Sequence, residues 1–245
     1  IQVKTLPARR GRKRKESRYF LGFLVSSLTG VAVFVLLPFG DVVRRSFLTV
    51  MSGEYVGLNN YRAVLHNQAF RLAVKNTICF SVTAIVLVTG LGLAAALLLS
   101  RLQRIRLIKS LYLFPLAIPA AAVVIVWHMF FYSRDFGSLT AAYLWKYSGY
   151  PIVLWLEGIA AISRQLTEAA RVDGADRLQV FLFVELPCLR GSLYTIIILS
   201  FLNSLKIYRE VYLAAGAYPG EDIYMLQHLF HNWYVSLEFD KMAAA

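Results

Sequence analysis

The chain has 245 residues, of which 58% are hydrophobic and 16% charged, and its mean hydropathy is +0.57. This composition lies outside the range of soluble globular proteins and indicates an integral membrane protein. The net charge of +12 does not indicate a nucleic-acid partner, because eight of the 26 Lys and Arg residues lie in the first 18 positions, where attraction to anionic lipid and membrane topology explain them.

A basic tail at residues 1–18 leads into the first apolar run, at residues 19–38. A helix needs about 20 apolar residues to cross about 30 Å of hydrocarbon, so this run is long enough to span a membrane. We interpret it as a retained anchor rather than a signal peptide, because it lacks a small-residue cleavage site.

Four further apolar runs follow, and a sixth begins near residue 239. They occupy residues 78–100, 110–132, 139–162 and 189–208. Such long, continuous runs predict helices rather than barrel strands, which alternate over about ten residues. The predicted fold is therefore all-α and integral to the membrane, with one transmembrane domain over residues 19–245. We expect about six transmembrane helices, the last of them truncated.

Lys and Arg residues gather at alternate connections between the runs. They occur in the tail, in the loop at residues 101–109 and between residues 163 and 190. The positive-inside rule places these segments in the cytoplasm, so we expect a cytoplasmic amino terminus.

The cysteine and histidine residues predict no metal site. Cys79 and Cys188 lie in or beside different apolar runs and are predicted to be small, buried and unpaired side chains. His228 and His231 would share one face of a helix, but no nearby carboxylate or thiol completes a metal site. We therefore predict a surface helix there.

The stretch EAARVDGAD, at residues 168–176, separates the fourth run from the fifth. Its first part has the composition of a helix, which Gly174 is suited to end because glycine adopts the left-handed conformation without a steric penalty. Asp176 and Gln179 have the spacing of a capping box for a second helix. We predict a cytoplasmic helix-turn-helix over residues 163–187, called the elbow below, with the low relief of a docking surface.

The sequence EAARVDGADRLQVFLFVELP resembles the EAA loop of the permease subunits of ABC transporters. The family pattern is E-A-A, three residues, G, nine residues, an aliphatic residue, one further residue, and L-P. The matching positions are Glu168, Ala169, Ala170, Gly174, Val184, Leu186 and Pro187. The neighbouring Asp173 and Ala175, and the GLNNY at residues 57–61, are similar to the carbohydrate-uptake branch that contains the maltose-type permeases.

This resemblance implies a permease subunit of an ATP-driven importer, forming half of a pathway for a sugar or oligosaccharide across the inner membrane of a bacterial or archaeal cell. The implied partners are a second permease, which family analogy favours as a different chain, two ATPase subunits, an extracytoplasmic solute-binding protein and membrane lipid. The elbow would dock on an ATPase through Glu168, Ala169, Ala170, Asp173, Gly174, Ala175, Leu186 and Pro187. Alternatively, Glu168 only caps or solvates its own helix.

The same resemblance implies that the chain is not an enzyme and binds no cofactor, since the partner ATPase would hold ATP and Mg. The sequence agrees, because it contains no G-x-x-x-x-G-K-[ST] phosphate loop.

Aromatic and amide side chains within the predicted spans could line a route for a saccharide, because rings stack on the C–H faces of sugars and amides exchange hydrogen bonds with hydroxyls. The candidates are Trp127, Tyr147, Tyr194 and Asn203. The alternative is that the aromatic residues belong to the interfacial belt and that Asn203 joins neighbouring helices.

A secondary transporter or channel subunit is the alternative function. It predicts intramembrane carboxylates or inverted repeats, whereas Glu157 is the one acid well within a predicted span and the sequence has no evident repeat. The sequence also departs from the family pattern in the short stretch between the third and fourth runs. That departure predicts that residues near 138–142 are missing.

Overall fold

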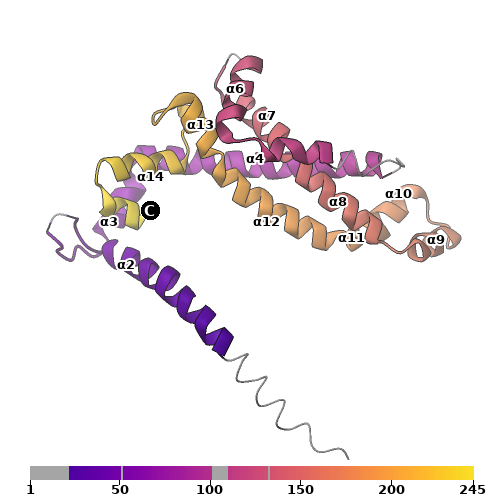
Figure 1. Cartoon of the computed structure of the whole chain (residues 1–245), viewed down its shortest axis with the longest axis horizontal. Coiled ribbons are helices and arrows are strands. Elements are labelled where there is room, and N and C mark those ends of the chain that lie inside the picture. Colours follow the sequence, from indigo (N-terminus) through magenta and orange to yellow (C-terminus); the bar gives the residue numbers. More distant parts are fainter. Residues whose placement is uncertain (1–21, 51, 101–109, 132) are drawn as a thin grey trace, which may run out of the picture. The chain divides into compact units, whose positions relative to one another are not determined.

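The computed structural model describes residues 22–50, 52–100, 110–131 and 133–245. Helices dominate these residues, whose one strand-like pairing is an isolated bridge between Leu48 and Tyr55 (Figure 1). The predicted all-α class is therefore confirmed. The predictions for the basic tail and for the loop at 101–109 fall outside the described residues. The chain divides into two compact units, one joining the residues up to Leu65 with Trp233–Ala245, the other comprising His66–Asn232.

The first unit contains a helix over Gly22–Arg45. It includes a wider π-helical turn, η1 (Ala32–Leu36), and continues into α2 (Leu37–Arg45). The predicted end at residue 38 is too early, because Pro38 lies in the first turn of α2, where a missing N–H removes no needed hydrogen bond. The unit also holds α15 (Phe239–Ala244) and most of α3 (Asn59–His66).

The second unit is organised around α4 (Gln68–Leu99). This helix of 32 residues is about 48 Å long and begins ten residues before the predicted span. The side chain of Asn67 caps it by accepting a hydrogen bond of 3.1 Å from the Phe70 N–H. The other principal helices of this unit are α6 (Ala120–Phe130), α7 (Phe136–Tyr147), α8 (Gly149–Ala161), α12 (Arg190–Lys206), α13 (Tyr208–Ala215) and α14 (Leu226–Val235).

The third apolar run is not the single straight helix that we predicted over residues 110–132. The helical segments Ser110–Ala117 and Ala120–Phe130 meet at an angle of 102°. Ile118 between them is extended, because the ring of Pro119 disfavours the helical conformation in the preceding residue.

The fourth run is also divided, at Ser148, into α7 and α8. Where we expected residues to be missing, near 138–142, the chain forms α7, whose capping box joins Asp135 and Ser138.

Three described helices are long and apolar enough to cross a membrane, namely Gly22–Arg45, Gln68–Leu99 and Arg190–Ala215. The bent pair in the third run brings the number to four if it counts as one span. A complement of about six spans therefore stays a prediction.

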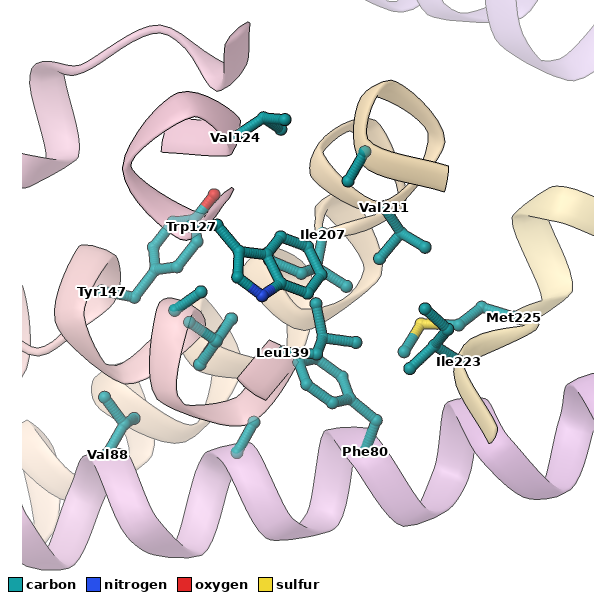
Figure 2. Packing of buried hydrophobic residues seen from close by; sticks show 14 of the residues in the cluster. Phe80, Val88, Val124, Trp127, Leu139, Tyr147, Ile207, Val211, Ile223 and Met225 are labelled. Carbon is teal, nitrogen blue, oxygen red and sulfur yellow. The ribbon is translucent and has the colours of Figure 1, made fainter. Parts of the chain in front are cut away.

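Two separate hydrophobic clusters stabilise the second unit. The first cluster lies where α7 packs on α4 and α6 packs on both α7 and α13 (Figure 2), and includes Phe80, Leu139, Tyr143, Ile207 and Val211. The second cluster lies where α8 and α12 pack on the carboxy-terminal half of α4, and includes Ala96, Trp155, Leu156, Leu189 and Ile196.

The prediction that both cysteines are buried is wrong, because Cys79 and Cys188 are free and exposed in this chain. The buried positions of α4 recur every three or four residues through Phe80, Ala84 and Val88. Cys79 falls beside this stripe, so its thiol lies on a face that no described helix covers.

Candidate coupling elbow and transport pathway

The elbow forms the helix-turn-helix that the sequence predicts. Its first helix, α9 (Arg164–Val172), is followed by Gly174 with a φ of 90°, and the Ala175 N–H donates to the Ala170 carbonyl oxygen at 3.0 Å. These are the features of an α-helix that is terminated by a residue in the left-handed conformation. Glycine adopts this conformation without the steric penalty of a side chain.

The second helix of the elbow begins with the predicted capping box. The Gln179 N–H donates to Asp176 Oδ1, and the Asp176 N–H donates to Gln179 Oε1, both at 2.8 Å. These bonds satisfy two donors that a helix start leaves without partners. The helix runs on as α10 (Arg177–Val180), η3 (Phe181–Glu185) and α11 (Leu186–Cys188). Pro187 does not break it, because this proline lies in the first turn of α11.

The residues predicted to contact an ATPase lie on the surface of the elbow. Glu168, Ala169, Asp173 and Gly174 are exposed, whereas Ala170, Ala175, Leu186 and Pro187 are half-buried. A Cβ atom added at Gly174 would meet no atom of the described residues within 4 Å, so the space beside it is open in this part of the chain.

Large apolar side chains surround these positions. Val172, Leu178 and Phe183 have exposed fractions of 87%, 64% and 76%. Apolar side chains this exposed beside charged residues at a helix-turn-helix are typical of a surface that a partner covers. The elbow therefore has the chemistry of a docking site.

The four candidate pathway residues do not form one site. Trp127 and Tyr147 are buried within the first cluster (Figure 2), with exposed fractions of 3% and 6%. Tyr194 is exposed and Asn203 half-buried on α12. These two are nine residues apart, which places them on opposite faces of that helix. Of the four candidates, Tyr194 is the exposed one, with an exposed fraction of 63%.

A buried ion pair was missed by the sequence analysis. Lys146 Nζ on α7 lies 2.6 Å from Glu210 Oε1 on α13, and the two side chains are only 8% and 2% exposed. The sequence predicts Glu157 as the one intramembrane acid because the predicted fifth span ends at residue 208. The helix resumes after a break of one residue at Ile207 and ends at Ala215, and this extension contains Glu210. A lysine within a predicted span, which requires a partner charge, was the available signal.

The helix predicted around His228 is present as α14, and the face that carries His228 is packed. His228 is fully buried, and its Nδ1 accepts a hydrogen bond of 3.2 Å from the Met225 N–H. Its ring lies edge-on to Tyr208 on α13, with the ring centroids 4.7 Å apart. Burial, with a smaller contribution from the neighbouring His231, lowers the pKa of His228 to about 4. The imidazole is therefore neutral at physiological pH.

Comparison with known proteins gives a family match over more than half of the chain. The profile of the family described as "binding-protein-dependent transport system inner membrane component" matches residues 89–228, which include the whole elbow.

Curated relatives match over most of their length. The trehalose/maltose transport system permease protein MalF of Thermococcus litoralis is 28% identical, over 91% of this chain and 85% of that protein. The multiple sugar-binding transport system permease protein MsmF of Streptococcus mutans is 25% identical, over 86% of this chain and 82% of its own. The sulfoquinovosyl glycerol transport system permease protein SmoG of Agrobacterium fabrum is 26% identical, over 84% of this chain and 77% of that protein.

A solved structure has the same fold. A chain of a bacterial ABC transporter involved in the import of the acidic polysaccharide alginate superposes with a TM-score of 0.75, over 97% of this chain and 91% of that one, at 15% sequence identity. The family match removes the alternative of a secondary transporter or channel subunit. This chain belongs to the family of binding-protein-dependent transport system inner membrane components, the permease subunits of ABC transporters.

Proposed function

We propose that this chain is the permease subunit of an importer for a sugar or oligosaccharide and couples to a separate ATPase through the elbow. The exposed elbow between α8 and α12 is the observation that carries the proposal. Glu168, Ala169 and Gly174 are exposed there, together with the apolar side chains of Val172, Leu178 and Phe183. The names of the relatives, which refer to trehalose, maltose, multiple sugars and sulfoquinovosyl glycerol, support a carbohydrate as the substrate class.

In this proposal the partner ATPase binds ATP and Mg and grips the elbow on the cytoplasmic side. Glu168 would make a charge-assisted contact with a basic residue or backbone donor of the ATPase, contributing about 1.5–3 kcal/mol. A ligand shifts a conformational equilibrium only through different interactions with its two states. The contact must therefore persist while the elbow moves with the ATPase.

We further propose that the pathway lies between this chain and a second, different permease, and that an extracytoplasmic solute-binding protein delivers the substrate. An alginate transporter of the same fold has been solved in complex with a periplasmic protein bound to an alginate pentasaccharide, which supports such an arrangement. The amino terminus would be cytoplasmic and the complex would lie in the inner membrane.

The test is transport by the complete complex, purified with its accompanying chains and reconstituted into vesicles. We expect ATP-dependent uptake of at least one of radiolabelled trehalose, maltose and sulfoquinovosyl glycerol. Gly174→Asp should insert normally and abolish uptake, because the new side chain fills the space that the partner needs.

Gly53→Asp is the matched control. Gly53 also has a positive φ, of 66°, and open space around it, but it lies outside the elbow. Uptake without ATP would refute the importer, and equal uptake by the Gly174→Asp and Gly53→Asp variants would refute the docking role of the elbow.

A further inference from the structure

The elbow is the tip of a helical hairpin in which α8 leads into the elbow and α12 leads out of it (Figure 1). The two arms pack closely near the tip, since a Cβ atom added at Gly158 would lie 2.5 Å from Ser192 Oγ. At their other ends the hydroxyl oxygens of Tyr150 and Ser200 lie 2.6 Å apart. We call this hairpin, residues 149–206, the lever.

Both arms of the lever are interrupted at the end far from the elbow. Ser148 separates α7 from α8, and Ile207 separates α12 from α13. The first interruption has the sequence Ser-Gly followed by Pro151, a combination typical of helix kinks. Terminal positions of helices are where hinge motions change the backbone angles.

The buried ion pair lies immediately beyond both interruptions. Lys146 is two residues before Ser148, and Glu210 is three residues after Ile207. Their contact of 2.6 Å therefore joins α7 to α13 at the two points where the lever begins and ends. Lys146 Nζ also lies 5.4 Å from the centroid of the Tyr147 ring, a favourable cation–π distance.

The two hydrophobic clusters divide at the same place. The segments joined by the ion pair belong to the first cluster, through Tyr143 on α7 and Val211 on α13. Most of the lever packs in the second cluster, through Trp155 on α8 and Ile196 on α12. Tyr143 Oη on α7 donates a hydrogen bond of 3.0 Å to the Ser200 carbonyl oxygen in the lever, and both of these groups are uncharged. Such a bond is weaker than a charge-assisted one and easier to exchange.

We propose that Lys146 and Glu210 are positioning residues that pin the two helix interruptions together. The lever then turns about Ser148 and Ile207 as one body when the elbow moves. This inference rests on the proposed function, because an ATPase must move the elbow. Burying two charges offsets most of their attraction, so a buried ion pair contributes little net stability compared with apolar side chains of similar volume. Its position beside both interruptions gives it a different role, which is to fix their geometry.

The double substitution Lys146→Met with Glu210→Leu separates pinning from stabilisation. A pair that only stabilised the fold could be replaced by these apolar side chains without effect. Apolar side chains cannot replace an ion pair that fixes the geometry of the two interruptions. We therefore expect the variant complex to assemble and hydrolyse ATP but to move roughly tenfold less substrate per ATP. Exchanging the charges, with Lys146→Glu and Glu210→Lys, should restore part of the coupling.

Spin-label distances test the pin with the ion pair intact. In a complex carrying Cys79→Ser and Cys188→Ser, one label pair replaces the exposed Trp145 and Leu213, which lie on the pinned segments. A second label pair replaces Trp145 and the exposed Arg190, which lies at the elbow end of α12 but outside the docking surface. Between the nucleotide-free complex and the complex trapped with ATP and vanadate, we expect the first distance to stay constant and the second to change.

Two results would refute the positioning role of Lys146 and Glu210. One is a first distance that changes as much as the second, and the other is a double variant with wild-type transport per ATP. The transport substrate is whichever of the three radiolabelled compounds the wild-type complex takes up. Wild-type uptake without ATP would refute the proposed function itself. If uptake depends on ATP but the double substitution leaves it unchanged, only the positioning role of Lys146 and Glu210 is refuted. A double variant that fails to assemble leaves the distance measurement as the deciding test.

Discussion

The close packing of the two arms of the lever can be tested with a single methyl group. In a Gly158→Ala variant the new Cβ atom would lie 2.5 Å from Ser192 Oγ and 2.8 Å from Leu189 Cδ2. Favourable contacts between carbon atoms are about 3.5–4.0 Å long, so both neighbours must move by roughly 1 Å. Overpacking of this kind costs about 1–3 kcal/mol, whereas replacing a helical glycine with alanine contributes about 0.5–1 kcal/mol of stability. We expect net destabilisation of about 1–2 kcal/mol.

Gly191→Ala is the matched control. Gly191 lies on α12 directly before Ser192, but a Cβ atom added there meets nothing within 4 Å. This variant should be neutral or slightly more stable than wild type. The assay is thermal unfolding of the detergent-solubilised complex, followed by fluorescence-detected gel filtration. A melting temperature for Gly158→Ala equal to or above that of Gly191→Ala would show that the arms are not closely packed.

Three further predictions concern local structure. Asp176→Ala removes the capping box and should destabilise the start of α10 by about 1 kcal/mol, seen as faster amide hydrogen exchange there; unchanged exchange would contradict the cap. His228 is neutral when folded, with a pKa of about 4, and gains a proton on unfolding below pH 6.5. Stability should therefore fall from about pH 6.5 towards pH 4, by up to about 3 kcal/mol, and His228→Asn should flatten this dependence of the melting temperature. The Asn76 side-chain amide donates to the Tyr224 carbonyl oxygen at 3.0 Å, and Asn76→Leu removes this donor. The variant should lose about 1–3 kcal/mol of stability and have a lower melting temperature. An unchanged melting temperature would show that water replaces the amide.

The elbow could be predicted from the sequence because its determinants are local. The capping box joins Asp176 to Gln179, three positions away, and the helix end depends on the conformational freedom of Gly174 alone. Interactions over three or four residues leave a signature in spacing and residue type. No such signature exists for the hairpin that carries the elbow, since the contact between Gly158 and Ser192 depends on how two helices pack.

The interruption at Ile207 shows the limit most clearly. Neither glycine nor proline marks it, and the residue itself is 1% exposed within the first cluster (Figure 2). A sequence pattern treats this position as ordinary helix interior, and the predicted fifth span therefore ended arbitrarily at residue 208. With that end, Glu210 was counted outside the membrane and Lys146 had no partner.

Polar groups at membrane depth nevertheless constrain the fold in a way that sequence can reveal. A lysine such as Lys146 cannot lie within an apolar helix bundle unless an acid or a set of hydrogen-bond acceptors meets it. That requirement selects a longer fifth helix, because Glu210 is the acid that such a helix brings to the lysine. The partner of an intramembrane charge thus fixes a helix boundary that hydropathy leaves open. In this chain the ion pair also lies beside the two interruptions from which the hairpin that carries the elbow extends.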